Sequence, residues 1–452
     1  MQAFAMRRGA ETPTTIGDEP LLEQANPYGS VLRDPVTGLY RMWYLGKSPY
    51  TEYYATSEDG IAWDLPDLGI LPADEFGRKN AFLGKGQFDV NGHWLAGDSG
   101  PEGFCVLDAE IQDHPGAKAR FTAMYLCGVD YAPGGLCIAY SDDGITWTAD
   151  DHNPVVSGWL DTNNGIIWDP DIQRYVVYGR SPVHATASVN PNRFVSRMES
   201  PDLVNWEPPT TVFHTDDHDA DPWDMIDEGL LREDGKPIVR GRNRQFYGLS
   251  AFKSAGIYLG LLQVYDVPSG KSWLELVHST DGKEWRRDPC RTPYMNVRPD
   301  SWESEMILPA AASPPVVVGD EIRIYYGGYD RNHHDSGSEY RMGLSYRTIG
   351  RDRWIGYHSA DREAELLTTP IKAGSRLTLN ASTKKDGWIR VELITDWGKE
   401  IEGYTLSDAT AIAGDSFAHE VRWGDRVNLP EGQDVRLRIR SRHASVYALE
   451  MG

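Results

Sequence analysis

The sequence predicts an all-β protein in which a five-bladed β-propeller, residues 1–358, is followed by an antiparallel β-sandwich, residues 359–452. Three observations lead to this prediction. A short hairpin phrase recurs five times in the first part of the chain, strand patterns of period two fill the last part, and helical patterns are almost absent. The repeated phrase defines the first domain, and the change of pattern defines the second.

The repeated phrase is a strand ending in a small polar residue, an Asp-Gly turn and then a tryptophan. Asp-Gly supplies the positive φ angles that a tight hairpin needs, and the tryptophan can pack beneath the turn. The copies end at Trp63, Trp147, Trp206, Trp285 and, more weakly, Trp354. Their spacings of 84, 59, 79 and 69 residues vary too much for a solenoid, whereas the loops of a propeller absorb such insertions. Five copies therefore predict five blades.

Each blade is expected to begin with an inner strand that lines a central channel. The third blade shows this most clearly, with an inner strand within residues 161–168 and a second strand at 174–180. The fourth blade is expected to begin at residues 219–224 and the fifth at residues 301–306. Residues 1–20 lack a periodic pattern and are expected to form an arm or a closing strand.

The sequence pattern changes near residue 360. Segments 376–380, 387–393, 419–423 and 435–440 alternate polar and apolar side chains, which is the period of strands buried on one face. Turn residues separate these segments. They predict a small antiparallel β-sandwich.

Charge and hydropathy exclude several classes of partner. The chain has 45 basic against 67 acidic residues, a formal net charge of −22. Nucleic acids and anionic membranes both require basic surface, so neither is expected as a partner. The chain has no run of 18 apolar residues, and residues 1–8 lack the apolar segment of a signal peptide. We therefore expect either a cytoplasmic protein or a secreted one whose signal has been removed.

The four cysteines show no metal-ligand spacing, so no zinc site is indicated. Neither a metal nor a cofactor is expected. They are Cys105, Cys127, Cys137 and Cys290. Cys127 and Cys137 could face each other across one hairpin. Because cysteine is among the most buried residue types, buried thiols are favoured for all four.

The starts of the predicted inner strands carry carboxylates or amides in most blades. They are Asn26, Asp98 or Glu102, Asp161 with Asn163 and Asn164, Asp221 with Asp224, and Glu303 with Glu305. In a propeller these starts converge on the face where small molecules bind. Confined carboxylates repel one another, which raises at least one pKa and separates an acid from a base, as glycoside hydrolysis requires. The alternative for any single residue is a solvated loop charge or a hydrogen bond to an inner strand.

The five hairpins and the inner-strand acids resemble the five-bladed glycosidases of families 32, 43, 68 and 117, and most closely family-32-like proteins with a C-terminal β-sandwich. Residues 161–170, 325–330 and 389–408 carry the resemblance. It implies cleavage of a glycosidic bond, with a furanoside or a plant or algal oligosaccharide as the expected substrate. In those families an Asp base or nucleophile, an Asp that stabilises the transition state and a Glu acid come from successive blades. That order is matched here by Asp161, Asp221 or Asp224, and Glu303 or Glu305, although blade one opens with Asn26 in place of an aspartate.

Further side chains near the predicted mouth are expected to bind the carbohydrate. They are Asn26, Tyr28, Asn164, Trp223, Trp302, Arg180, Arg242 and His333. Arg180, Arg240 and Arg242 could bind an acidic or sulfated sugar, or form buried salt bridges. Two alternatives to hydrolysis stay open. One is a carbohydrate-binding propeller without catalysis, and the other is a glycoside phosphorylase that uses these arginines to hold phosphate.

Overall fold

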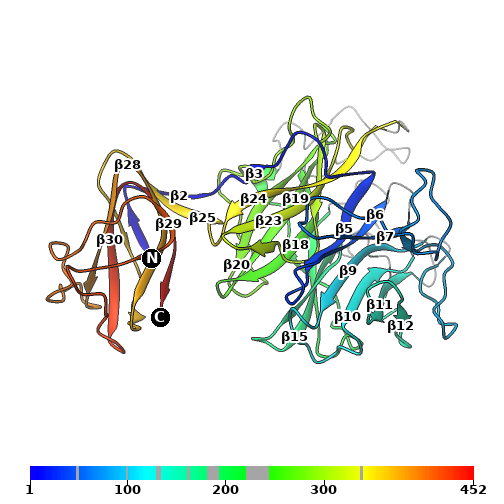
Figure 1. The fold of residues 1–452 in the computed structure, drawn as a ribbon, viewed down its shortest axis with the longest axis horizontal. Helices are drawn as coiled ribbons and strands as arrows, with labels where there is room; N and C mark the ends of the chain where they lie inside the picture. Colours follow the sequence, from blue (N-terminus) through cyan, green and yellow to red (C-terminus); the bar gives the residue numbers. More distant parts are fainter. Residues whose placement is uncertain are drawn as a thin grey trace, which may run out of the picture. The chain divides into compact units, whose positions relative to one another are not determined.

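The protein is all-β, as predicted (Figure 1). The computed structural model describes residues 1–46, 50–97, 100–128, 134–158, 160, 163–180, 193–219, 244–335 and 339–452. Within these ranges the only helical turn is a 3-10 turn at Asp217–Asp219. No helix among the described residues has the length and apolarity to cross a membrane.

The first three blades are separate antiparallel sheets, each built from consecutive strands. Blade one is β5 (Ala25–Arg33), β6 (Tyr40–Gly46), β7 (Glu52–Ser57) and β8 (Ala81–Leu83). Blade two is β9 (Glu102–Asp108), β10 (Phe121–Leu126) and β11 (Gly135–Ser141), with β12 (Thr148–Ala149) and β13 (Val156–Ser157) at its edge. Blade three is β14 (Gly165–Asp169), β15 (Arg174–Arg180), β16 (Val195–Ser200) and β17 (Thr210–Phe213).

Blades four and five are joined into one sheet by a single parallel bridge between Ser272 and Met306. Blade four is β18 (Arg244–Ser254), β19 (Ile257–Asp266) and β20 (Ser272–Ser279). Blade five is β21 (Met306–Ala310), β23 (Glu321–Tyr329) and β24 (Met342–Gly350), with the short β22 (Val316–Val318) on β23. The predicted start of blade four at residues 219–224 is wrong, because the strand that neighbours the inner strands β14 and β21 is β18.

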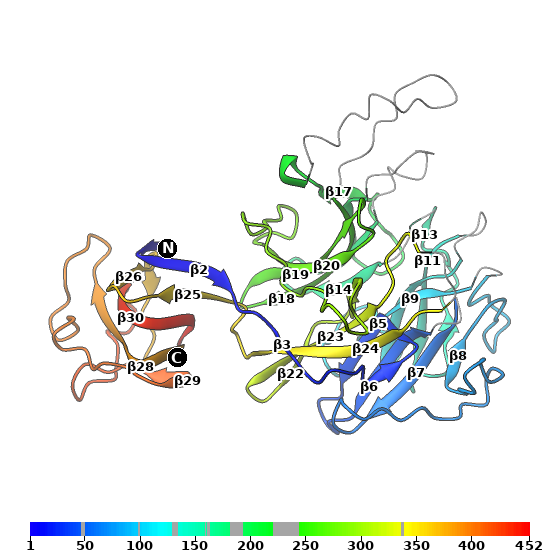
Figure 2. The ribbon, with the colours of Figure 1, turned by 90° about the horizontal axis from the view of Figure 1, so that it is seen from above.

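The described strands close into a ring of five blades, which confirms the predicted propeller. The inner strands neighbour one another in the order β5, β9, β14, β18, β21 and back to β5. The N-terminal segment supplies outer strands β3 (Thr14–Thr15) and β4 (Leu22–Glu23), which pair with β24 in blade five. Figure 2 shows β3 beside β24. The N-terminal segment is therefore a closing strand, as expected, and it joins the beginning of the propeller to its end.

The repeated hairpins are held by the aspartate of each Asp-Gly turn. In blade one the Asp59 Oδ1 atom accepts the backbone N–H groups of Ile61 at 2.8 Å and Ala62 at 2.9 Å. Asp143, Asp202 and Asp281 make the same pair of contacts in the next three blades. In blade three Leu203 stands where the other turns have glycine and still has a φ of 70°. The aspartate therefore fixes the turn even without glycine.

The turns also join neighbouring blades. An aromatic side chain on the second strand of one blade donates a hydrogen bond to the turn glycine carbonyl of the next blade. The pairs are Trp43 with Gly144 at 2.6 Å, Tyr178 with Gly282 at 2.8 Å, and Tyr325 with Gly60 at 2.9 Å. The last pair links blade five to blade one. At each glycine a Cβ atom would lie 2.8 Å or less from the aromatic residue, so both the positive φ and the close approach require glycine.

The other compact unit is the predicted antiparallel β-domain, and it includes the N-terminus of the chain. Its long strands are β28 (Leu377–Ile394) and β30 (Asp434–Met451), which pair with β25 (Ile355–Ser359), β26 (Ala364–Leu367), β27 (Ile371–Lys372) and β29 (Asp415–Glu420). Strands β1 (Gln2–Phe4) and β2 (Met6–Ala10) pair with β26 and β25. The unit therefore comprises Met1–Thr14, Val317–Ile322 and Thr348–Gly452, whereas the predicted boundary fell between residues 358 and 359. Leu379, Val391 and Leu437 lie in its core.

Two of the cysteines form a disulfide. Cys137 lies on β11 and Cys127 follows β10, with their Cα atoms 5.7 Å apart, and their sulfur atoms are bonded. The prediction of buried thiols is therefore wrong for this pair, and it is wrong for Cys290, which is exposed. It is confirmed for Cys105. The adjacent antiparallel strands bring Cys127 and Cys137 together, which is the alternative that the sequence left open.

Candidate functional site at the mouth of the propeller

The candidate site lies at the end of the channel where the inner strands begin, which we call the mouth. Hydrogen bonds between neighbouring inner strands show which of their residues lie at the same height along the channel. These bonds join Ala312 N to Gly29 O, Val106 N to Ser30 Oγ, Cys105 Sγ to Asn164 O, and Ser250 Oγ to Ala310 O. Residues that precede this height in the five strands therefore gather at one end of the channel. Each blade sends the start of its inner strand and the end of its second strand there.

Eight of the predicted site residues are described. They are Asn26, Tyr28, Asn164, Arg180, Trp302, Glu303, Glu305 and His333. Asp161, Asp221, Asp224, Trp223 and Arg242 lie outside the described residues, as do Asp98 and Arg240. Their roles stay predictions.

Two buried amides from different blades reach the mouth. Asn26 begins blade one and Asn163 precedes β14 of blade three, and each is 1% exposed. The Asn26 Oδ1 atom and both polar side-chain atoms of Asn163 have no hydrogen-bond partner among the described residues. Buried amides are almost always hydrogen-bonded, so these atoms indicate a place where a polar ligand can supply the missing hydrogen bonds.

The two predicted glutamates have different surroundings. Glu303 is fully buried, and its Oε1 atom accepts hydrogen bonds from Arg298 Nε and, at 3.1 Å, from Arg347 Nη2. Glu305 keeps a side chain that is 26% exposed and is paired with Lys271 at 2.9 Å. Two guanidinium groups compensate the charge of Glu303 and hold it away from solvent. Glu305 is therefore the more exposed of the two glutamates, whereas the Oε2 atom of Glu303 is buried without a hydrogen-bond partner among the described residues.

Two of the predicted aromatic site residues, Trp302 and Tyr28, are buried in this structure. Trp302 is 2% exposed and stacks on Tyr326, with ring centroids 6.2 Å apart and planes at 22°. These rings pack inside the blades and present little face to a ligand.

A further carboxyl group near the mouth, that of Glu52, was not predicted from the sequence. It begins the third strand of blade one, β7, and is fully buried. Burial raises the pKa of Glu52 well above its usual range, and the charge of Glu102 at the start of β9 raises it further. The backbone N–H groups of Gly103 and Phe104 lower the pKa of Glu52, although neither forms a hydrogen bond to its carboxyl oxygens. Glu52 is the first residue of an aromatic strand, and in the sequence a buried acid at this position looks the same as an exposed one.

We expect the stability of the protein to fall less steeply with rising pH when Glu52 is replaced by glutamine. The folded pKa of Glu52 is raised, so the stability linked to its protonated form is fully present below the unfolded pKa of about 4.3 and is lost as the pH rises toward the folded pKa. Glutamine stays neutral throughout. Melting temperatures at pH 4, 6 and 8 test this. The melting temperature of the variant should rise relative to that of the wild type as the pH rises.

The matched control for this prediction is Glu58→Gln, because Glu58 is exposed in the same blade. The difference in melting temperature between the Glu58→Gln variant and the wild type should stay constant across the same pH range. A Glu52→Gln variant that loses stability relative to the wild type between pH 4 and pH 8 would contradict the assignment of a buried neutral carboxyl.

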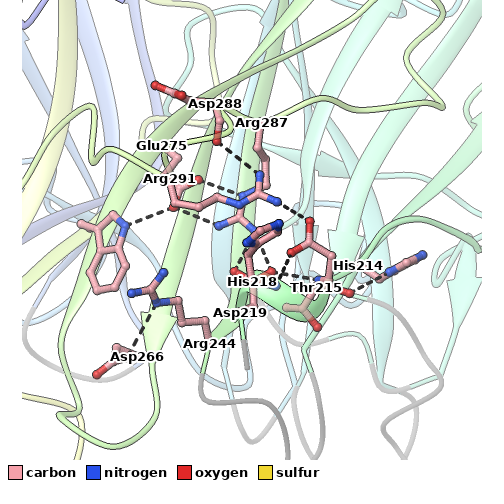
Figure 3. A network of polar contacts seen from close by, with 12 residues as sticks. His214, Thr215, His218, Asp219, Arg244, Asp266, Glu275, Arg287, Asp288 and Arg291 are labelled. Carbon is pink, nitrogen blue, oxygen red and sulfur yellow. Dashed lines mark hydrogen bonds and ion pairs between the residues drawn. The ribbon is translucent and has the colours of Figure 1, made fainter. Parts of the chain in front are cut away.

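A buried ion triad anchors the chain in blade four (Figure 3). Arg287 Nη1 donates to both oxygens of Asp219 at 2.8 and 2.7 Å, and its Nε and Nη2 atoms donate to Glu275 at 2.8 and 2.9 Å. The three side chains are at most 3% exposed. Asp219 is the last described residue before the stretch that carries the predicted Asp221 and Asp224. The triad therefore fixes the point from which this stretch departs.

Cations and aromatic rings from blades three to five gather at another part of the mouth. Arg180, at the end of β15, donates from Nη2 to the Tyr247 carbonyl at 3.0 Å and lies 4.9 Å from the Tyr247 ring centroid. Arg193 lies 5.0 Å from the same ring. Exposed His333 contacts Tyr247 Oη through Nε2 at 3.1 Å. The predicted Arg180 and His333 are thus brought together, and Arg193 and Tyr247 are additional.

A cavity of about 390 Å³ lies at the opposite end of the channel. Its lining includes Leu32, Val106, Ile167 and Phe252, from the C-terminal parts of four inner strands. Lys253 at its rim is paired with Asp169 at 2.8 Å. The cavity is mainly apolar, whereas the buried amides and the partly exposed carboxylate lie at the mouth, so the mouth is the candidate site. Among the described residues no group of three or more His, Cys, Asp or Glu side chains is placed to hold a metal ion.

No protein-family model matches the sequence, and no curated protein matches it. Among solved structures the chain is similar to a thermostable family-43 glycoside hydrolase, with a TM-score of 0.50 and 12% identity over 74% of this chain and 92% of the other. It is also similar to an endo-arabinase from Bacteroides thetaiotaomicron (TM-score 0.46, 12% identity, 75% and 97% covered) and to an N-acetylgalactosamine deacetylase from F. plautii (TM-score 0.46, 14% identity, 77% and 97% covered). The likeness to the family-43 structure confirms the predicted resemblance at the level of the fold alone.

Proposed function

We propose that this protein is a glycoside hydrolase that binds a saccharide at the mouth of the propeller and cleaves a glycosidic bond there by carboxylate acid–base chemistry. The observation that carries the proposal is the pair of buried amides, Asn26 and Asn163. The Oδ1 atom of Asn26 and both polar side-chain atoms of Asn163 have no hydrogen-bond partner among the described residues. Sugar hydroxyl groups both donate and accept hydrogen bonds, so they complement amides better than a purely apolar ligand does.

The carboxylates supply the proposed chemistry. Glu305 is the more exposed of the two predicted catalytic glutamates, and it is the proposed proton donor to the leaving oxygen. Asp161, two residues before Asn163 in the sequence, is the proposed base or nucleophile, and Asp221 or Asp224 the residue that stabilises the transition state. Glu303, between two arginines, is proposed to position its neighbours rather than to transfer a proton.

The fold is compatible with this proposal because a family-43 glycoside hydrolase has the same fold. A shared fold does not determine activity, so the argument rests on the mouth. The substrate is proposed to be a short oligosaccharide, with furanosides first among those to be tried.

Hydrolysis of a panel of aryl furanosides and pyranosides tests the proposed function. We expect release of the aryl group from at least one glycoside at a rate far above the background, with no requirement for added metal or phosphate. A protein that binds one sugar, shown by a raised melting temperature, but cleaves none of the panel or its natural oligosaccharides would instead be a carbohydrate-binding propeller.

A further inference from the structure

We propose that the mouth contains a subsite for a negatively charged group, a carboxylate, sulfate or phosphate, formed around Arg193 with Tyr247, Tyr265 and His333. This inference rests on the proposed function, because it names the class of saccharide that the same mouth would take. In an oligosaccharide the charged group would be a uronate carboxylate or a sulfate ester.

Arg193 is held between two tyrosine rings. Its Cζ atom lies 5.0 Å from the Tyr247 ring centroid and 5.5 Å from that of Tyr265. Its Nη1 atom donates to Gln245 Oε1 at 2.7 Å. These contacts come from the first two strands of blade four and fix the guanidinium plane without neutralising its charge.

The charge of Arg193 is uncompensated among the described residues. Three buried arginines of the propeller have carboxylate partners: Arg197 pairs with Glu199, Arg287 with Asp219 and Glu275, and Arg347 with Glu303. Arg193 has no such pair in the described part of the chain, and its buried Nε–H has no acceptor there. In a chain with a net charge of −22, carboxylates for pairing are abundant, so the lack of one beside half-buried Arg193 in the described part of the chain indicates a ligand that brings its own negative charge.

Polar hydrogens around Arg193 suit an oxyanion. The hydroxyl groups of Tyr247 and Tyr265 meet the two ring nitrogens of His333 at 3.1 and 3.5 Å. Burial raises the pKa of Tyr265 above its ordinary value, with Arg193 opposing the shift, so this phenol remains a donor at neutral pH. His333 is exposed, which leaves the cluster open at the rim. In neutral His333 one ring nitrogen donates to one tyrosine oxygen and the other accepts the O–H of the second tyrosine, which leaves one phenol O–H as a donor. The guanidinium and this phenol match the oxygens of a carboxylate, sulfate or phosphate.

Calorimetric binding to the wild-type protein tests the subsite and identifies the source of the anion. The probes are galacturonate, glucuronate, a sulfated galactose, inorganic phosphate, and the neutral methyl glycosides of galactose and glucose. We expect at least one anion to bind about tenfold or more tightly than the neutral sugars, and this preference to weaken as the salt concentration rises. Preference for phosphate alone would identify free phosphate, and a phosphorolytic reaction, as the source.

Arg193→Gln should reduce the affinity for that anion by about ten- to a hundredfold, because it removes a charge-assisted contact. Arg193→Lys should restore part of it. The matched control is Arg174→Gln, since Arg174 lies at the other end of β15 and should not affect binding. Unchanged circular dichroism and melting would show that the variants are folded.

Two results would overturn the subsite: no preference for any anion in the wild type, or equal anion affinity in the wild type and a folded Arg193→Gln variant. Cleavage of neutral glycosides with no anion preference would reject the subsite and leave the proposed hydrolase intact. Anion binding that depends on Arg193 without hydrolysis of any glycoside would support the subsite and reject the hydrolase.

Discussion

Replacement of Arg287 by alanine is expected to lower the free energy of unfolding by about 3–5 kcal/mol. The variant leaves two carboxylates, Asp219 and Glu275, buried in blade four without the guanidinium that bridges them. Neither carboxylate can rotate into water without unpacking its surroundings. Chemical denaturation at neutral pH measures the change. Because Asp219 precedes the predicted catalytic Asp221 in the sequence, activity should fall as well.

Arg286→Ala is the matched control, because Arg286 is the exposed neighbour of Arg287 in sequence. It should change the stability by less than about 0.5 kcal/mol. Removing the two carboxylates together with the cation, by Asp219→Asn and Glu275→Gln in the Arg287→Ala background, should recover part of the loss. An Arg287→Ala variant as stable as the Arg286→Ala variant would show that the triad does not anchor this blade.

The propeller could be predicted from the sequence because its hairpins are specified locally. Each aspartate hydrogen-bonds to the backbone two and three residues later, so the signal survives wherever the turn occurs, even at Leu203, where glycine is missing. The start of blade four could not be located in this way. Residues 219–224 combine acids with a tryptophan and resemble an inner-strand start, whereas the described inner strand β18 begins at Arg244.

The contents of the mouth could be predicted only in part, because the sequence does not reveal pairing across blades. Glu303 and Glu305 look equivalent in sequence, but only the structure shows two arginines on Glu303 and exposure at Glu305. Arg193 lies before β16 and belongs to no recognisable sequence motif. It becomes a candidate for binding an anion only because the structure shows no carboxylate partner for it among the described residues. The Cys127–Cys137 disulfide likewise depends on strand register, which cysteine burial preferences do not determine.

Asp161→Asn is expected to reduce kcat/KM for the best glycoside of the panel by about a thousandfold, with an unchanged melting temperature. Loss of a general base or nucleophile costs about 10²–10⁴-fold. The matched control is Asp171→Asn, because Asp171 is exposed beyond the far end of β14 and should leave the kinetics unaltered. Retention of activity in the Asp161→Asn variant would remove this residue from the proposed mechanism.

Comparison of Glu303→Gln with Glu305→Gln then separates positioning from proton transfer. Glu303→Gln removes the charge that balances Arg298 and Arg347 inside blade five, so a loss of activity should be accompanied by a lower melting temperature. Glu305→Gln changes a partly exposed side chain and should lower activity while stability stays nearly constant. An aryl glycoside with a good leaving group needs little protonation, so it should be cleaved by the Glu305→Gln variant far better than one with a poor leaving group. If both substrates lose activity equally, Glu305 is not the acid.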